Sequence, residues 1–281
     1  MTGPSVSGAR KWLIRAVEAA SIVAACLFLY PIYFIVSMTL KSAEEMAASP
    51  LRLPSRIDFG HYAKAWEMMH FPRVFFNTLL ITSFSIALLI VLGAMAAYPL
   101  ARRAERVYYA VYLLFLSGIM LPFQLAMIPL YKLINVLHLV NTYHGAILIY
   151  VAMNLPFTVF LYTGFVKSAP RELEEAAMID GCSIFRSFWT TVFPLLKPVT
   201  ATVAVLTALS VWNDFIVPLL FLSDQHYRTI TIELYTFVGE HVTDWTLLFP
   251  GLVLSVTPLL LFYLFLQKYM IKGVAAGSLK G

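Results

Sequence analysis

The sequence predicts an all-α membrane protein with six transmembrane helices. Its 281 residues are 60% hydrophobic and only 12% charged, whereas about 25% charged residues is usual for a soluble domain. Apolar windows of about 20 residues, which span a hydrocarbon layer about 30 Å thick, recur along the chain. Because lipid cannot pair exposed backbone groups, and because the alternating pattern of a β-barrel is missing, each window is expected to be a helix.

The six expected helices follow one another at approximate boundaries. They are residues 19–40, 74–100, 108–130, 143–165, 198–222 and 245–266. Basic residues precede the first helix, as they do in a signal peptide, but its apolar stretch is too long and lacks an Ala-x-Ala cleavage pattern. It is therefore expected to remain as an anchor.

Basic residues give the orientation. With the N-terminus inside, 13 of the 20 lysines and arginines fall in cytoplasmic segments, which is the bias that orients membrane proteins. Six spans then return the C-terminus to the cytoplasm. Since these positions account for the net charge of +5, no nucleic-acid partner is expected.

This topology divides the chain into segments with different surroundings. They are a cytoplasmic N-terminus (1–18), the first transmembrane helix (19–40), an external loop (41–73), a five-helix core (74–266) with a cytoplasmic loop (167–197), and a cytoplasmic tail (267–281). Whether the external loop is helical is left open by the sequence.

The cytoplasmic loop is expected to form two short helices joined by a hinge. Ser168 and Pro170 are predicted to cap and start the first helix, and three early glutamates suit the positive end of its dipole. Gly181 can end that helix in the left-handed conformation, and Ser183 can cap the second helix.

The second helix of the loop has an apolar stripe at helical spacing. The stripe comprises Ile184, Phe185, Phe188, Trp189 and Val192. Such a face fits packing against the bundle or lying at the membrane interface. Periodicity alone is therefore compatible with a plain interfacial hairpin as well as with a docking surface for a soluble partner.

The loop also resembles a known family. Glu175-Ala176-Ala177, three residues, Gly181 and a hydrophobic helix ending in proline, with Asp180 before the glycine, resemble the loop of the membrane-spanning subunits of prokaryotic ABC importers. Other stretches resemble the carbohydrate-type importers, in particular the smaller permease of the maltose/maltodextrin system. These are residues 120–124, 128–131, 139–143, 212–215, 218–219 and 272–281.

The resemblance implies the type I ABC importer permease fold in a prokaryotic inner membrane. A second homologous permease, two ATPase subunits and an extracytoplasmic sugar-binding protein would be partners, in addition to lipid. This chain would form half of the pathway for a sugar or oligosaccharide. It would bind no cofactor and catalyse nothing, because ATP and Mg²⁺ would be bound by the ATPase subunits.

The resemblance also implies two contact regions for the ATPase subunits. The coupling-helix residues would be Glu175, Ala176, Ala177, Asp180 and Gly181. Glu175 would pair with a basic group, the alanines would allow close approach, and Gly181 would give the bend. The tail residues Gly273, Gly277 and Lys280 would form a second contact, although a solvated terminus fits them equally well.

Polar residues inside the bundle have two interpretations each. Asn213 and Asp214 either line the sugar path or outer gate, or form structural hydrogen bonds. An acidic side chain at that depth must be either hydrated, as it would be in the path, or paired with other protein groups. Asn154 and Pro156 either interrupt the fourth helix, as discontinuous helices do at transporter binding sites, or simply kink it.

Enzymatic motifs are missing from the sequence. It contains no phosphate-binding loop, no Gly-x-Ser-x-Gly elbow and no His-Glu-x-x-His, so neither catalytic residues nor metal ligands are expected. Two other functions remain open. An ion-gradient-driven secondary transporter would need several intramembrane ionisable residues and a repeat, and a membrane scaffold recruiting a cytoplasmic partner would not need broken helices.

Overall fold

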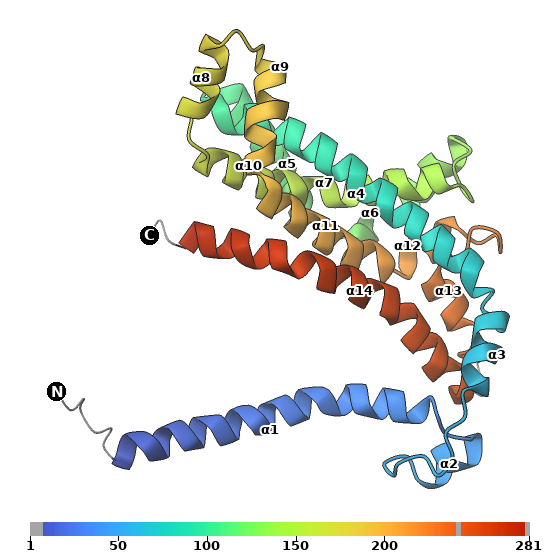
Figure 1. The fold of residues 1–281 in the computed structure, drawn as a ribbon. Coiled ribbons are helices and arrows are strands. Elements are labelled where there is room, and N and C mark those ends of the chain that lie inside the picture. Colours follow the sequence, from blue (N-terminus) through green and yellow to red (C-terminus); the bar gives the residue numbers. More distant parts are fainter. Residues whose placement is uncertain (1–7, 240–242, 279–281) are drawn as a thin grey trace. The chain divides into compact units, whose positions relative to one another are not determined.

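The computed structural model describes residues 8–239 and 243–278, most of which are helical (Figure 1). The chain divides into two compact units. Of the described residues, 8–68, 237–239 and 243–254 form the first unit, and 69–236 and 255–278 form the second. The last helix begins in the first unit and continues into the second.

The helices of the first unit are α1 (Gly8–Met38), α2 (Ala43–Ala48), α3 (Gly60–Met68) and the start of α14 (Trp245–Ser278). The longer helices of the second unit are α4 (Phe71–Arg102), α5 (Arg106–Met120), α6 (Phe123–Val136), α7 (Tyr143–Ser168) and α11 (Lys197–Trp212). Its shorter helices are α8 (Glu172–Ile179), α9 (Ile184–Ser187), α10 (Phe193–Leu195), α12 (Ile216–Phe221) and α13 (Ile230–Tyr235), with a π-helical turn, η1 (Phe188–Val192), between α9 and α10.

Helix length and composition support the predicted membrane class. Among the described residues, α1, α4, α7 and α14 are each long and apolar enough to cross a bilayer. Two bent pairs, α5 with α6 and residues 184–195 with α11, raise the number of candidate spans to six if each pair is one span. The predicted all-helical fold with six spans is therefore confirmed, although two of the spans are not straight helices.

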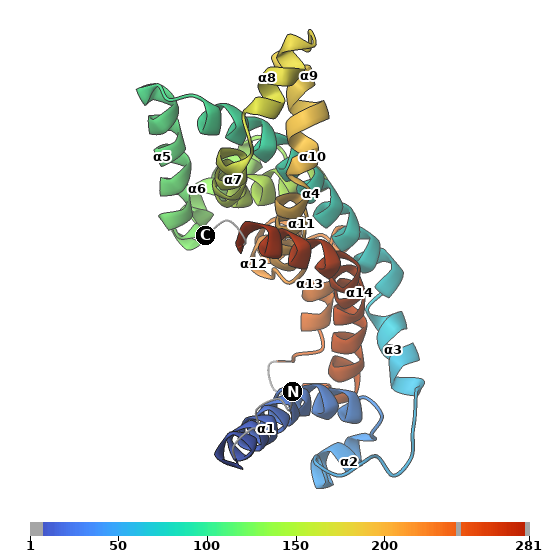
Figure 2. The ribbon, with the colours of Figure 1, turned by 60° about the vertical axis from the view of Figure 1, so that its left-hand side comes forward.

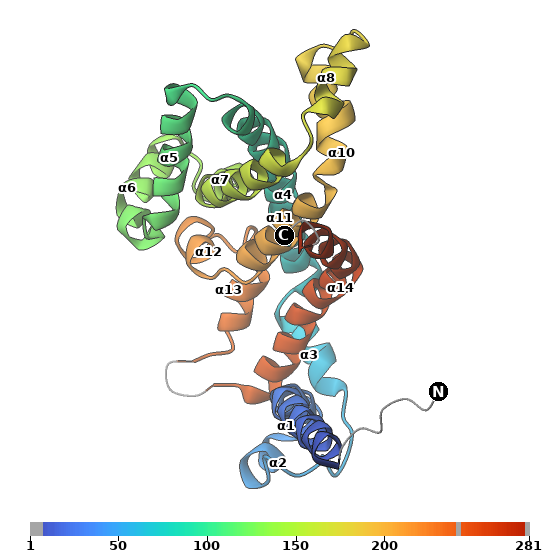
Figure 3. The ribbon, with the colours of Figure 1, turned by 90° about the vertical axis from the view of Figure 1, so that its left-hand side faces the viewer.

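The third expected span is a bent pair. α5 and α6 meet at an angle of 101°, on either side of Leu121 and Pro122 (Figure 3). Proline has no N–H to continue the helical ladder, and it disfavours helical backbone at the residue before it. The sequence prediction of one continuous helix over residues 108–130 was wrong for this reason.

The fifth expected span, residues 198–222, is also interrupted. α11 ends at Trp212 and α12 begins at Ile216. The backbone N–H of Val217 in the first turn of α12 donates to the Asp214 carboxylate at 2.9 Å. This side-chain acceptor satisfies a donor that the break would otherwise leave unpaired.

The first unit holds most of the expected external loop, which is partly helical. α2 and α3 lie within residues 41–73. The loop is fixed by Lys41, whose buried ammonium donates to the carbonyls of Ser49 at 3.1 Å and Pro50 at 2.8 Å. A buried lysine is tolerated because these acceptors replace water.

The core of the second unit is built on the pairing of α4 with α7, which α11 crosses (Figures 1 and 2). At Gly93 a Cβ atom would lie 2.4 Å from Cγ2 of Thr158 on α7. Glycine is therefore required for the two helices to approach this closely. Small residues at helix contacts are typical of membrane proteins, where van der Waals packing drives association.

A methyl group at Gly93 should weaken this pairing. We expect Gly93→Ala to lower the free energy of unfolding by about 1–3 kcal/mol, because the added methyl overpacks a closed contact. The matched control is Gly164→Ala on α7, where a Cβ would meet nothing within 4 Å. Thermal unfolding of the purified variants in detergent would contradict this account if both had the same transition temperature.

Candidate functional site

α8 begins later than the sequence predicted. Ser168 does not cap it, because α7 continues to Ser168, whose hydroxyl donates to the Phe165 carbonyl at 2.8 Å. The N-cap position of α8 is Arg171, in helical conformation and without a side-chain cap. The prediction failed because Ser168, which resembles a helix cap in the sequence, is the last residue of α7.

The end of α8 agrees with the prediction. Gly181 has φ = +84°, the left-handed conformation. Its N–H bonds to the Met178 carbonyl, and the N–H of Cys182 bonds to the Ala177 carbonyl, both at 3.0 Å. These two bonds form a Schellman motif. Ser183 then caps α9, since its side chain accepts the Arg186 N–H at 3.3 Å.

The predicted docking residues lie on this α8–α9 hairpin, which projects past the ends of α4 and α7 (Figures 2 and 3). Ala177 is half-buried, and the other four, Glu175, Ala176, Asp180 and Gly181, are exposed. Large apolar side chains surround them: Leu173, Met178, Ile179, Ile184 and Phe185 are all exposed, with Ile179 at 86%. The tip is therefore more apolar than a free cytoplasmic loop requires.

The apolar stripe of the second loop helix serves two surfaces. Phe188 and Val192 are buried against α4 and α7, while Ile184 and Phe185 are exposed at the tip. Phe188 and Val192 are the first and last residues of the π-helical turn η1, where the backbone widens and the Phe193 N–H bonds to the Phe188 carbonyl. π-turns occur mostly as single turns within helices, frequently at functional sites.

Sequence reasoning missed the residue that anchors the hairpin, Glu174. Its side chain is 8% exposed, and its carboxylate forms an ion pair with Arg102 and accepts the Arg102 Nε–H at 2.8 Å. The Tyr98 hydroxyl donates to its other oxygen at 2.8 Å. The sequence held one indication of this contact: Tyr98 and Arg102 are four residues apart on α4, so they share one helix face and can both reach the same carboxylate.

A hollow of about 390 Å³ lies beside this anchor. Its lining combines the end of α4 with the hairpin: Tyr98, Pro99, Arg102, Arg103, Arg171, Glu174, Glu175, Met178 and Ile184. The hollow therefore joins the buried ion pair to the exposed docking residues. A side chain of a docked protein could enter it beside Glu175.

Asp214 has the structural hydrogen bonds that one interpretation predicted. Its carboxylate accepts the Tyr150 hydroxyl at 2.9 Å and the Val217 N–H at 2.9 Å. Its backbone carbonyl accepts the Thr231 hydroxyl at 2.7 Å. The neighbouring Asn213 is exposed, and its amide donates to the Leu209 carbonyl at 3.0 Å. Asp214 thus joins α7, α12 and α13.

Asn154 and Pro156 do not interrupt α7, which is continuous from Tyr143 to Ser168. The Asn154 amide donates to the Tyr150 carbonyl at 2.8 Å, one helical turn back. The structure therefore fits a continuous or gently kinked helix here, and the discontinuous-helix interpretation was wrong.

The turn regions near the start of α4 are held by buried polar groups. Asn77 donates to the carbonyls of His226 at 2.7 Å and Arg228 at 2.9 Å, and it accepts the Tyr143 hydroxyl at 2.7 Å. In the same loop, the backbone N–H of His226 lowers the pKa of the Asp224 carboxyl from its ordinary value. These bonds fix the connection between α12 and α13.

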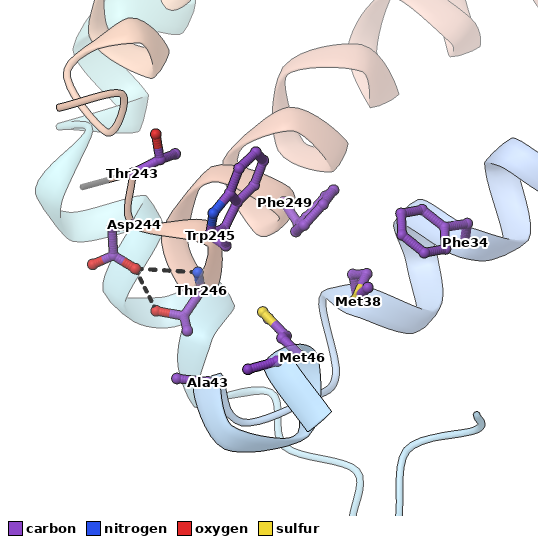
Figure 4. Close-up of a pocket in the computed structure, with 10 residues that line it drawn as sticks. Phe34, Met38, Ala43, Met46, Thr243, Asp244, Trp245, Thr246 and Phe249 are labelled. Atoms are coloured by element: carbon purple, nitrogen blue, oxygen red, sulfur yellow. Dashed lines mark hydrogen bonds between the residues drawn. The ribbon is translucent and has the colours of Figure 1, made fainter. Parts of the chain in front are cut away.

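A hollow of about 710 Å³ lies in the first unit (Figure 4). Phe34, Met38 and Met46 face it, as do Trp245 and Phe249. At its edge, the Asp244 carboxylate accepts hydrogen bonds from the Thr246 backbone N–H at 3.1 Å and from the Thr246 hydroxyl at 2.6 Å. The rest of the lining is mainly apolar.

The tail residues are only partly described. Gly273 and Gly277 lie within α14, which extends through most of the expected tail at 267–281. Lys280 lies outside the described residues. Within residues 8–239 and 243–278, no group of three or more His, Cys, Asp or Glu side chains could hold a metal ion.

Comparison with known proteins decides the family. Residues 89–276 match the binding-protein-dependent transport system inner membrane component family. The chain belongs to this family. It is therefore an inner-membrane permease component, and the resemblance to carbohydrate-type ABC importer permeases is confirmed, while the finer resemblance to the smaller maltose/maltodextrin permease stays a prediction.

The sequences of two relatives align with nearly the whole of this permease. It is 38% identical to the melibiose/raffinose/stachyose import permease protein MelC of Bacillus subtilis, over 97% of this chain and 99% of that protein. It is 33% identical to the diacetylchitobiose uptake system permease protein NgcG of Streptomyces coelicolor, over 94% and 88%.

A solved structure shares the fold. A chain of a bacterial ABC transporter that imports the acidic polysaccharide alginate matches with a TM-score of 0.82 at 23% identity, covering 95% of this permease and 99% of that chain.

The Asp214 bonds predict a difference between two substitutions. Asp214→Leu should lower the free energy of unfolding by about 1–3 kcal/mol for each buried donor left unpaired, whereas Asp214→Asn retains an oxygen acceptor and should cost less. Thermal unfolding of both purified variants measures this. Equal losses would show that the hydrogen bonds to Tyr150 and Val217 contribute nothing.

Proposed function

We propose that this permease is the membrane-spanning subunit of an ATP-driven importer and forms half of the translocation pathway for a sugar or oligosaccharide. The observation that carries the proposal is the α8–α9 hairpin, which is capped where α8 ends and α9 begins, anchored at Glu174 and apolar at its exposed tip. Such a hairpin suits docking to a soluble protein better than it suits a free loop.

We propose three kinds of protein partner for this permease. Two ATPase subunits dock on the cytoplasmic side and bind ATP and Mg²⁺, while this chain catalyses nothing. A second homologous permease completes the pathway, and an extracytoplasmic binding protein delivers the sugar. We propose that the loop at 41–73, which contains α2 and α3, faces that binding protein.

The proposed docking contact has a charged and an apolar part. Glu175 pairs with a basic group of the ATPase subunit, and Ala176 and Ala177 allow its backbone to approach closely. Burial of Ile179 and Phe185 contributes about 1.5–3 kcal/mol for each side chain. Asp180 and Gly181 complete the turn, and the tail with Gly273, Gly277 and Lys280 provides a second contact.

The proposed substrate class rests on the relatives, whose names include oligosaccharides of two to four sugar units. Among the proposed path residues, Asn213 is exposed and free to meet a sugar hydroxyl with its amide oxygen, whereas Asp214 is bonded to Tyr150 of α7 and Asn154 is bonded within α7. The identity of the sugar can be found with a mixture of labelled melibiose, raffinose, stachyose, diacetylchitobiose and maltotriose.

Charge reversal at Glu175 tests the docking contact. Glu175→Lys should abolish co-purification of the ATPase subunits and reduce ATP-dependent uptake from the sugar mixture by at least about tenfold, because attraction to a basic group becomes repulsion at a desolvated interface. The matched control is Glu172→Lys, an exposed glutamate of the same helix outside the docking set. Native association and uptake in Glu175→Lys would overturn the docking proposal.

The left-handed turn gives a second test of the same hairpin. Gly181→Pro should prevent ATPase association, since proline requires φ near −65° where the chain has +84°. Gly181→Asn should retain most of it, because asparagine tolerates this conformation. Pull-down of the ATPase subunits with each variant measures the difference. Equal association of the two variants would show that the turn does not position the docking surface.

A further inference from the structure

α8 is attached to the end of α4 through a carboxylate that is separate from the predicted docking residues. Glu174 is 6% exposed, whereas Glu172 and Glu175 in the same helix are exposed. A carboxylate buried to this extent is costly unless it is paired and hydrogen-bonded. Its burial therefore requires the partners that α4 provides.

Those partners bind both oxygens of the carboxylate. The Arg102 Nε–H donates to Oε1 at 2.8 Å, and the Tyr98 hydroxyl donates to Oε2 at 2.8 Å. Two further bonds hold the segment before α8: Arg102 donates to the Ala169 carbonyl at 3.0 Å, and Arg171 donates to the Arg102 carbonyl at 3.1 Å. Because these bonds are directional, they fix the position of α8 relative to α4 as well as holding the two helices together.

Tyr98 also contacts the returning arm of the hairpin. Its ring lies 5.1 Å from the ring of buried Phe188, centroid to centroid, in a tilted arrangement. One residue of α4 thus contacts the segment on each side of the docking tip. The hairpin cannot shift along α4 without breaking the polar contact, the aromatic contact, or both.

We propose that Glu174, Arg102 and Tyr98 form a coupling clamp, which makes α8 move with α4 when a docked ATPase subunit moves. This inference rests on the proposed docking function. A loop joined to the bundle only by its peptide links would bend and absorb the displacement. With the clamp closed, displacement of α8 passes to α4 and, through the close contact at Gly93, to α7.

Glu174 is therefore a positioning residue, and its loss should separate ATP hydrolysis from transport. The complete complex, with its ATPase subunits and binding protein, is reconstituted in proteoliposomes with native chain, Glu174→Gln or the matched control Glu172→Gln. ATP hydrolysis and uptake are measured in the same vesicles. The probe is the sugar imported fastest from the mixture of melibiose, raffinose, stachyose, diacetylchitobiose and maltotriose.

We expect Glu174→Gln to retain the ATPase subunits and hydrolyse ATP, while sugar imported per ATP falls by at least about fivefold, the lower end of typical coupling energies. Glu172→Gln should keep the native ratio. A role in folding alone would lower the yield of complex without changing sugar imported per ATP. The native ratio in Glu174→Gln would therefore overturn the clamp.

A milder variant tests the clamp if the complex that carries Glu174→Gln fails to assemble. Tyr98→Phe keeps the ring against Phe188 and removes only the hydroxyl bond to Glu174. A fall of about twofold or more in sugar per ATP supports the clamp, and the native ratio overturns it. Glu175→Lys separates the two proposals: if it loses the ATPase subunits while Glu174→Gln keeps the native ratio, docking stands and the clamp is rejected.

Discussion

The hydrocarbon layer accepts no unpaired backbone group, and this constraint determines how the helices of the permease can stop and bend. Where α11 ends inside an apolar stretch, the Asp214 carboxylate accepts the Val217 N–H and the Tyr150 hydroxyl, so the break is supplied with partners. Where α7 begins, the Thr142 side chain accepts the Gly145 N–H at 3.1 Å. Polar residues in this bundle therefore first serve the fold, and a role in the sugar path has to be compatible with these bonds.

The α8–α9 hairpin is attached to the bundle in a different way from the long helices. Membrane helices pack by close contact of small residues, as Gly93 does against Thr158. The hairpin has no such contact at its tip, and it relies on a buried ion pair at one arm and on Phe188 and Val192 at the other. A buried ion pair is a poor source of net stability but a good source of fixed geometry, which is the property that a lever between two proteins needs.

Much of the fold could be predicted because helix length and hydropathy follow from the thickness of the bilayer. The left-handed Gly181 and the Ser183 cap were also predictable, because each depends on one residue and its neighbours in sequence. The choice of Glu174 over Glu175 as the buried acid could not be made, since it depends on Tyr98 and Arg102, about 75 residues earlier in the chain. The bend at Pro122 was missed because hydropathy averages over the break, and Asp214 was recognised without its partners.

The central claim is that the tip of the hairpin touches the ATPase subunit. The most direct measurement places a photo-crosslinking amino acid at Ile179, which is 86% exposed at the end of α8, in the complete complex in its native membrane. Leu114 on α5, 71% exposed within an apolar helix, is the control position. The account predicts a crosslink from Ile179 to the ATPase subunit and none from Leu114. A complex that imports sugar yet gives no ATPase crosslink from Ile179 would contradict it.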